Sequence, residues 1–200
     1  MTLDHLVLAA CAGAALTDWI AVARGWQALR WVAKPAALAL LLLWAALGPS
    51  AGWPLLAALT FSLLGDVYLM LPADLFAAGL GAFLIGHVCY LFAFDAPLLT
   101  RGLWLVGVLL LATPVTLRIL RAVPAAPLRV AVAAYMLVLA AMVASAAASG
   151  SLLAALGAAL FMLSDSMIAW SRFVAPFPGA RLAIIVTYHV GQYLLVSVLR

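Results

Sequence analysis

The chain has 200 residues, of which 70% are hydrophobic and only 8% are charged. Soluble domains carry about 25% charged residues, so this composition excludes a soluble globular protein and indicates an integral membrane protein. The formal net charge of +4 comes mainly from basic residues between apolar segments, where they set membrane orientation, and it does not indicate a nucleic-acid partner. Hydrophobic residues extend over the whole length, so we expect a single transmembrane domain over residues 1–200.

Eight apolar segments approach the length of about 20 residues that a membrane-spanning helix needs. Short breaks that carry Pro, Gly or charged residues separate them, so neighbouring helices must be antiparallel. We expect Lys34-Pro35 to open the second helix, because proline fits a first helical turn, and we expect only Pro114 to lie well inside a helix. The predicted fold class is an all-α polytopic membrane bundle with transmembrane helices over residues 3–23, 34–48, 53–71, 75–94, 102–119, 128–148, 151–171 and 181–199.

Basic residues predict the orientation of this bundle. Eight of the ten Lys and Arg residues lie at the breaks that follow the first, third, fifth and seventh helices. Since Lys and Arg accumulate on the cytoplasmic side, we expect both termini on the non-cytoplasmic side. The Ala- and Leu-rich sequence has a bacterial character, and we expect a multi-pass protein of the inner (cytoplasmic) membrane.

Two aspartates lie inside apolar segments, Asp66 within Phe61–Met70 and Asp165 within Leu160–Ala169. A charge at such a position costs roughly 2.5–3.5 kcal/mol, so an intramembrane aspartate indicates a functional site with a partner nearby. Counted from the predicted inner ends of their helices, both lie at a depth of roughly 8–9 Å, which makes them level. The two segments share a register, and the helix after each carries a His and a Tyr, which is a weak sign of a 4+4 internal repeat.

The function of the aspartates and of the other intramembrane polar residues stays open at this point. Asp66 and Asp165 fit a catalytic pair, a proton relay, or partners of Lys34 and other cations. Lys34 itself fits a snorkelling residue, a partner of Asp66, or a contact to an anionic headgroup. His87 and Tyr90 in the fourth helix, and Tyr188, His189 and Gln192 in the eighth, fit either a polar cavity or hydrogen bonds between helices.

Several chemistries find no support in the sequence. It has no GxSxG elbow, no HExxH motif, no cysteine cluster and no glycine-rich phosphate loop. The spacing of His87, His189 and the aspartates neither supports nor excludes a zinc site. We expect no metal and no cofactor.

An ordered set of motifs resembles the YhhN family of membrane proteins, known as the lysoplasmalogenase family. The matching elements are Lys34-Pro35, Gly65-Asp66, the run Phe76–Tyr90, Ser164-Asp165-Ser166, and Tyr188 with Gln192-Tyr193. The resemblance implies an eight-helix membrane hydrolase that cleaves the vinyl ether bond of a lysophospholipid, giving a fatty aldehyde and glycerophospho-ethanolamine or -choline. It maps Asp66 and Asp165 onto the family's acidic positions, with Lys34, His87, Tyr90, Tyr188 and Gln192 as further motif positions.

This chemistry suits two carboxyl groups. One protonated aspartic acid would protonate the β-carbon of the vinyl ether, and a carboxylate would stabilise the resulting oxocarbenium ion and activate water, as in glycosidases. We expect Asp66 and Asp165 to be catalytic, the lipid to enter from the membrane, and water to be the co-substrate. The residues expected to bind substrate are Lys34, His87, Tyr90, Ser164, Tyr188, His189 and Gln192. The alternatives are a small-molecule or proton-coupled transporter and a non-catalytic lipid-binding membrane protein.

Overall fold

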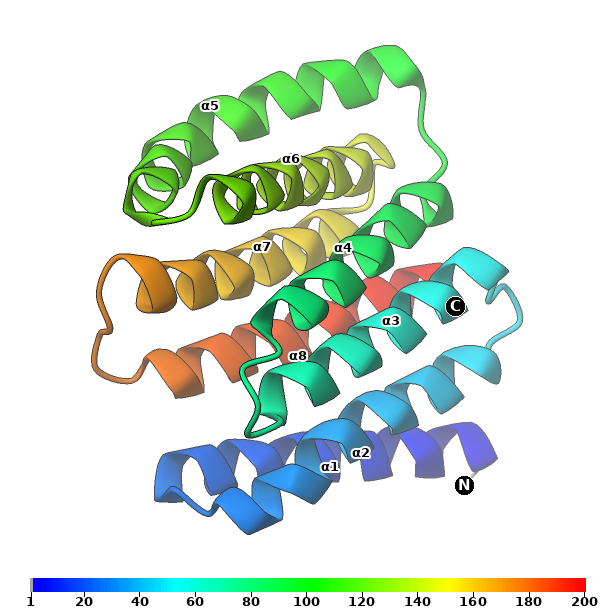
Figure 1. Cartoon of the computed structure of the whole chain (residues 1–200). Coiled ribbons are helices and arrows are strands. Elements are labelled where there is room, and N and C mark those ends of the chain that lie inside the picture. The colour runs from blue at the N-terminus through cyan, green and yellow to red at the C-terminus, as the bar shows by residue number, and fades with distance from the viewer. Residues whose placement is uncertain (1) are drawn as a thin grey trace. The chain divides into compact units, whose positions relative to one another are not determined.

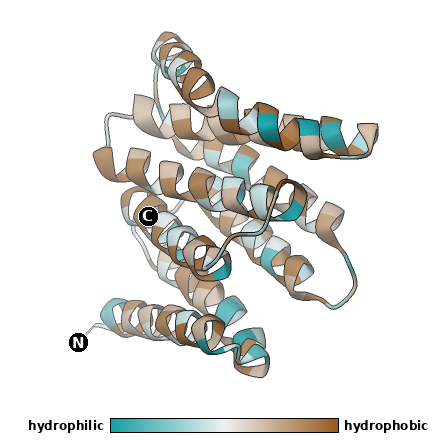
Figure 2. Ribbon diagram, turned by 90° about the vertical axis from the view of Figure 1, so that its left-hand side faces the viewer, coloured by the Kyte–Doolittle hydropathy of each residue, from teal (hydrophilic) through white to brown (hydrophobic). Residues whose placement is uncertain are grey.

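A computed structural model describes residues 2–200, which form eight α-helices and no strand. All eight helices are long and apolar enough to cross a membrane, so the all-α, eight-helix prediction is confirmed and the chain is a multi-pass integral membrane protein. Figure 2 shows helices that are mainly hydrophobic, with hydrophilic positions gathered toward their ends. The helices are α1 Leu3–Arg24, α2 Gln27–Ala46, α3 Trp53–Met70, α4 Phe76–Ala93, α5 Leu98–Ala122, α6 Ala126–Ala148, α7 Leu152–Phe173 and α8 Ala180–Leu199.

The start of α2 differs from the sequence prediction. Gly25 adopts a left-handed conformation with φ of 70°, and the Trp26 N–H donates to the Ala21 carbonyl at 2.8 Å, which ends α1 and reverses the chain. Helix α2 therefore begins at Gln27, so the prediction that Lys34-Pro35 opens it was wrong. Pro35 lies inside α2, as Pro114 lies inside α5, so the prediction of a single interior proline was also wrong. Membrane helices tolerate such prolines because neighbouring groups satisfy the freed backbone atoms.

The chain divides into two compact units, and the first contains residues 2–93 and 196–200. In it, α1 packs against α2, α2 against α3, and α3 against α4 (Figure 1). Glycines make the α3–α4 contact close: a Cβ atom on Gly65 would lie 2.5 Å from the Phe83 ring, and one on Gly86 would lie 3.1 Å from the Ala58 carbonyl oxygen. Gly79 likewise faces Leu69, whereas a Cβ atom on Gly81 would meet nothing within 4 Å.

The end of the chain belongs to the first unit as well. The Arg200 guanidinium pairs with the Asp4 carboxylate and lies 3.9 Å from the centre of the Trp44 ring. A cation over the face of a tryptophan is attracted by the ring quadrupole. This contact ties the last residue of the chain to α1 and α2.

The second unit contains residues 94–195. In it, α5 packs against α6 and α7, and α6 packs against α7 (Figure 1). Helix α7 starts after Ser151, whose hydroxyl oxygen accepts the Ala154 N–H at 3.2 Å as an N-cap. Helices α7 and α8 meet through two glycines, because a Cβ atom on Gly191 would lie 2.8 Å from the Gly157 carbonyl oxygen and 3.0 Å from the Phe161 nitrogen. Small residues at such crossings let membrane helices approach closely.

The sequence-based predictions of one domain over residues 1–200, of a 4+4 repeat and of both termini on the non-cytoplasmic side stay predictions.

The glycine crossing of α7 and α8 predicts a position-specific loss of stability. We expect Gly191→Ala to destabilise the fold by about 1–3 kcal/mol, because overpacking a tight contact forces backbone shifts. The matched control is Gly107→Ala in α5, where an added Cβ meets nothing within 4 Å. There the change should be neutral, or stabilising by up to about 1 kcal/mol, since alanine is the better helix former. Thermal unfolding in detergent measures both, and equal melting temperatures for the two variants would contradict the proposed crossing.

Candidate functional site

A buried ion pair joins α2 to α3 in the first unit. The Lys34 Nζ lies 2.8 Å from Asp66 Oδ1, and the two side chains are only 8% and 2% exposed. Gly65 supports this arrangement, because the Phe83 ring of α4 fills the space that a side chain at residue 65 would need. Lys34 is therefore buried rather than snorkelling, and among its three interpretations the structure shows the pairing with Asp66.

A second acid–base pair lies next to the first. Arg30 Nε is 3.7 Å from Asp18 Oδ1, and the Asp18 side chain is completely buried. Asp18 also interacts electrostatically with Lys34 and Asp66. Arg30 and Lys34 are four residues apart on α2 and share a face. The first unit thus holds a cluster of two acidic and two basic side chains, to which α1, α2 and α3 contribute.

Sequence reasoning missed the Asp18–Arg30 half of this cluster. It assigned Arg30 to a loop, because it started the second helix at residue 34 rather than at Gln27. A usable signal was present: residues 27–33 continue the helix in front of Lys34, and Asp18 is a third aspartate inside an apolar segment.

His87 and Tyr90 are both buried in the first unit, at 1% and 0% exposure. They lie on α4 near Phe83, whose ring centre is 6.4 Å from that of His87. The two predicted site residues of the fourth helix therefore face the protein interior, as a polar cavity or a structural hydrogen bond would both require.

The second unit contains its own polar cluster around Asp165 of α7. The Tyr135 hydroxyl of α6 donates a hydrogen bond to Asp165 Oδ2. Tyr135 also interacts electrostatically with Tyr188 of α8. The Gln192 side-chain amide donates to the Tyr188 hydroxyl oxygen at 3.4 Å, so these two residues share a face of α8. Three helices thus bring hydroxyl, carboxyl and amide groups together.

Ser164 and His189, two further predicted residues, also lie in the second unit. The Ser164 hydroxyl donates to the Ile184 carbonyl at 3.0 Å and links the two helices. The His189 ring is buried, with its centre 5.5 Å from that of the Tyr188 ring. Tyr188 in turn meets Phe161 edge to face at 5.2 Å, a favoured geometry for aromatic rings.

Tyr135 is the site residue that the sequence interpretation missed in this unit. It lies in the middle of α6 among apolar residues, where it attracts little notice beside an aspartate. A tyrosine hydroxyl in the membrane interior nevertheless needs a polar partner. That requirement was the available signal, although it could not have named Asp165 as the partner.

The depths of the two aspartates along their helices are unequal. Asp66 lies four residues before Met70, the last residue of α3, and Asp165 lies eight before Phe173, the last of α7. At a rise of 1.5 Å per residue these are about 6 Å and about 12 Å. The prediction that both aspartates lie roughly 8–9 Å from the inner ends of their helices was therefore wrong, because α7 extends beyond its predicted end.

Comparisons with known proteins cover most of the chain. The YhhN family matches residues 29–199. The lysoplasmalogenase TMEM86B of Homo sapiens is 38% identical over 151 residues, which make up 74% of this chain and 65% of that protein. The lysoplasmalogenase TMEM86B of Mus musculus is 36% identical over 180 residues, 89% of this chain and 78% of that protein.

A bacterial relative matches a shorter region. The uncharacterized membrane protein YhhN of Escherichia coli O157:H7 is 36% identical over 104 residues, which are 48% of this chain and 49% of that protein. The chain thus spans about two thirds of the human relative and about half of the bacterial one. No solved structure matches the chain. The family match includes Lys34, Asp66, Asp165 and the polar residues of α8, and it extends over far more than half of the sequence: the chain belongs to the YhhN family.

Proposed function

We propose that this protein is a lysoplasmalogenase-like hydrolase, which cleaves the vinyl ether bond of a lysophospholipid. The observation that carries the proposal is its similarity to mammalian lysoplasmalogenases, at 38% identity over 74% of the chain for the human protein and 36% over 89% for the mouse protein. The products are a fatty aldehyde and a glycerophospho-ethanolamine or -choline. A bacterial inner membrane is the proposed location, and the Escherichia coli relative supports it.

The reaction adds one water across one bond. A proton goes to the β-carbon of the vinyl ether, which leaves an oxocarbenium ion. Water attacks the carbon attached to oxygen and loses a proton, and the resulting hemiacetal collapses to aldehyde and alcohol. Two carboxyl groups serve this sequence, one as the proton donor and one as the carboxylate that stabilises the cation and activates water, as in glycoside hydrolysis.

Asp66 and Asp165 are the proposed carboxyl groups. Each is buried in a membrane-spanning unit and held by a neighbouring helix, Asp66 by Lys34 and Asp165 by Tyr135. Such contacts fix the direction of a carboxyl group before substrate arrives, and this preorganisation lowers the barrier of the chemical step. Water is the co-substrate. The residues proposed to contact the lipid are Lys34, His87, Tyr90, Ser164, Tyr188, His189 and Gln192.

Replacing either aspartate should abolish most of the activity. We expect Asp66→Asn and Asp165→Asn each to lower the rate of aldehyde release from a lysoplasmenyl lipid by about 10²-fold or more, the usual contribution of a general acid or base. Asp95→Asn is the control, because Asp95 is exposed in the loop before α5 and should keep the wild-type rate. Near-normal turnover in either test variant removes that aspartate from the chemistry.

The Asp66 variant needs a second control for stability. Asp66→Asn leaves the buried Lys34 ammonium without the Asp66 carboxylate, and breaking a buried ion pair costs about 3–5 kcal/mol. In the double variant Lys34→Met/Asp66→Asn we expect most of the melting temperature to return while aldehyde release stays lost. If activity returned together with stability, Asp66 would be a structural residue and not a catalytic one, and Lys34 would not be needed to bind the lipid.

Tyr135→Phe tests whether the hydroxyl supports Asp165. The change removes one hydrogen bond to a buried carboxyl group, worth about 1–3 kcal/mol, so we expect kcat to fall roughly tenfold while KM changes little. Tyr68→Phe is the matched control, since Tyr68 is half-buried on α3 in the first unit. Steady-state kinetics measure kcat and KM for both variants. An equal kcat for the two would show that the Tyr135 hydroxyl has no role in turnover.

A further inference from the structure

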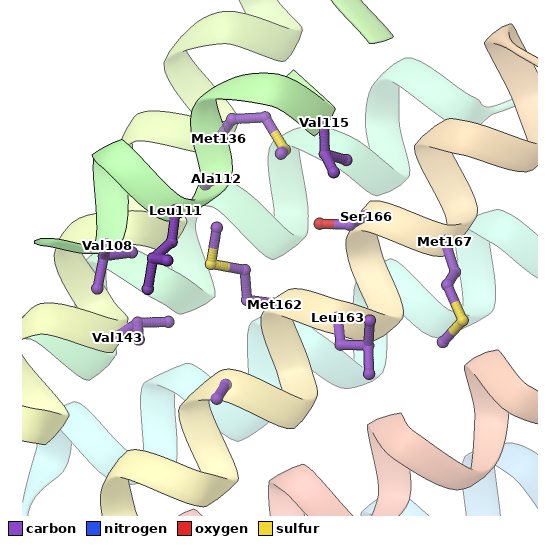
Figure 3. Close-up of a pocket in the computed structure, with 11 residues that line it drawn as sticks. Val108, Leu111, Ala112, Val115, Met136, Val143, Met162, Leu163, Ser166 and Met167 are labelled. Carbon is purple, nitrogen blue, oxygen red and sulfur yellow. The ribbon is translucent and has the colours of Figure 1, made fainter. Parts of the chain in front are cut away.

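The apolar groove of the second unit has no ionisable lining. It lies between α5, α6 and α7 with a volume of about 400 Å³ (Figure 3), and Ser166 is the one polar side chain among its 11 lining residues. None of these residues is acidic or basic. The first unit offers a feature of another kind, the buried pair of Asp18 and Arg30, to which the proposed function assigns no part.

The Asp18 carboxylate is buried without a hydrogen bond. Its side chain is 0% exposed, and within residues 2–200 no group donates to either of its oxygens. The buried Arg30 Nε likewise has no acceptor among these residues, and at 3.7 Å from Asp18 Oδ1 it lies beyond hydrogen-bond distance. Buried polar groups of native proteins nearly always have a partner in the protein or in ordered water. The carboxylate oxygens and the Arg30 Nε therefore mark a place for a small bound molecule.

Charge and size select the molecule that fits this pair. The Asp18 carboxylate repels an anion and the Arg30 guanidinium repels a cation. An apolar molecule would leave each buried polar group unsatisfied, at a cost of about 1–3 kcal/mol per group. Water is neutral and small, and it donates to a carboxylate oxygen while it accepts from an N–H. Buried waters typically make about three such hydrogen bonds to polar groups that have no other partner.

The pair lies near one end of the first unit. Arg30 is three residues after the start of α2 and Asp18 is six before the end of α1, which places them about 5 Å and about 9 Å from the turn between these helices. Exposed Arg24 and Trp26 lie at that turn, and both residue types gather where a membrane meets water. The Arg30 side chain is 23% exposed, so the pair extends from the aqueous end into the buried interior.

Asp18 is electrostatically coupled to the proposed catalytic carboxylate Asp66. Asp18 and Asp66 both interact with Lys34, and they interact with each other. The Asp66 side chain is only 2% exposed, so it has no direct exchange of protons with bulk water. Attack of water on the oxocarbenium ion releases a proton, and the carboxylate that accepts this proton must lose it before the next turnover. A second carboxylate with its own water, nearer the aqueous end, suits that step.

We propose that Asp18 and Arg30 bind a water molecule, and that Asp18 relays protons through it between Asp66 and the aqueous end of the first unit. The inference rests on the proposed hydrolase function and adds a residue to it. In each cycle the attacking water gives a proton to the Asp66 carboxylate, Asp66 passes it to Asp18, and Asp18 releases it through the bound water to bulk water. The proton donor of the reaction takes up one proton from bulk water, so the protons balance. Asp18 acts on the reaction through Asp66 and does not contact the lipid.

The first and later turnovers of Asp18→Asn test the relay. The first aldehyde per protein should appear at close to the wild-type rate, and kcat should then be lower by about tenfold or more, because Asp66 stays protonated after one turnover. Formate, a small weak acid that carries protons, should restore kcat to within about threefold of wild type, and Asp18→Glu should keep most of it without formate. Equal slowing of the first and later turnovers, without a response to formate, would make Asp18 a structural residue and overturn the relay.

Two further variants control for stability. Asp4→Asn is the matched control, because Asp4 lies on the same helix and also pairs with an arginine, Arg200; we expect the wild-type kcat and no effect of formate. The double variant Asp18→Asn/Arg30→Gln removes both charges, so no unpaired charge remains to destabilise the fold. It should melt close to wild type and still turn over slowly until formate is added. A wild-type kcat in this double variant contradicts the relay.

A crystal structure of the wild-type protein at a resolution that shows ordered water tests the site without any substrate. We expect a water at about 2.7–3.2 Å from an Asp18 oxygen and from Arg30 Nε. A direct hydrogen-bonded contact between Asp18 and Arg30, or another protein donor on the Asp18 oxygens, would overturn the water site.

These experiments separate the relay from the proposed function. If the wild-type protein releases aldehyde and Asp18→Asn has the same kcat as Asp4→Asn, the hydrolase stands and the relay is refuted. If the wild-type protein releases no aldehyde from any vinyl ether lipid while the crystal structure shows the water, the hydrolase and its relay are refuted and the water site stands.

Discussion

The ion pair between Lys34 and Asp66 is the interaction on which the first unit depends. Neither charge can be left alone in the interior of a membrane protein, because each would lose its hydration without compensation. Their contact at 2.8 Å requires α2 and α3 to be neighbours, with these two faces turned toward each other. The Asp18–Arg30 pair extends the same requirement to α1. The charged cluster therefore requires α1, α2 and α3 to pack next to one another.

Glycine supplies the geometry that the polar contacts need. Gly65 admits the Phe83 ring on the face of α3 next to Asp66, and Gly86 brings α4 close to the backbone of α3. In the second unit, the contact between Gly157 and Gly191 sets the approach of α7 to α8. The Ser164 hydroxyl and the Tyr188–Gln192 hydrogen bond lie on the same two helices. Between membrane helices, where burying apolar surface gains little relative to lipid, close packing and hydrogen bonds supply the association energy.

The proposed chemistry uses groups that the fold has already oriented. Asp66 and Asp165 are each fixed by a contact from another helix. A substrate bond that is sensitive to acid suits carboxyl groups that are buried and oriented in this way.

The sequence by itself determined the eight membrane helices, the membrane class and the two central aspartates, because hydropathy and the cost of a buried charge are properties of single residues and short segments. Only the tertiary structure decided the partners. Lys34 had three possible roles until the structure placed its Nζ against Asp66, and the parts that Arg30 and Tyr135 play were not predicted. A partner depends on how each helix is rotated and where it crosses its neighbour. That choice is made by side-chain packing between segments far apart in the chain, which local composition does not encode.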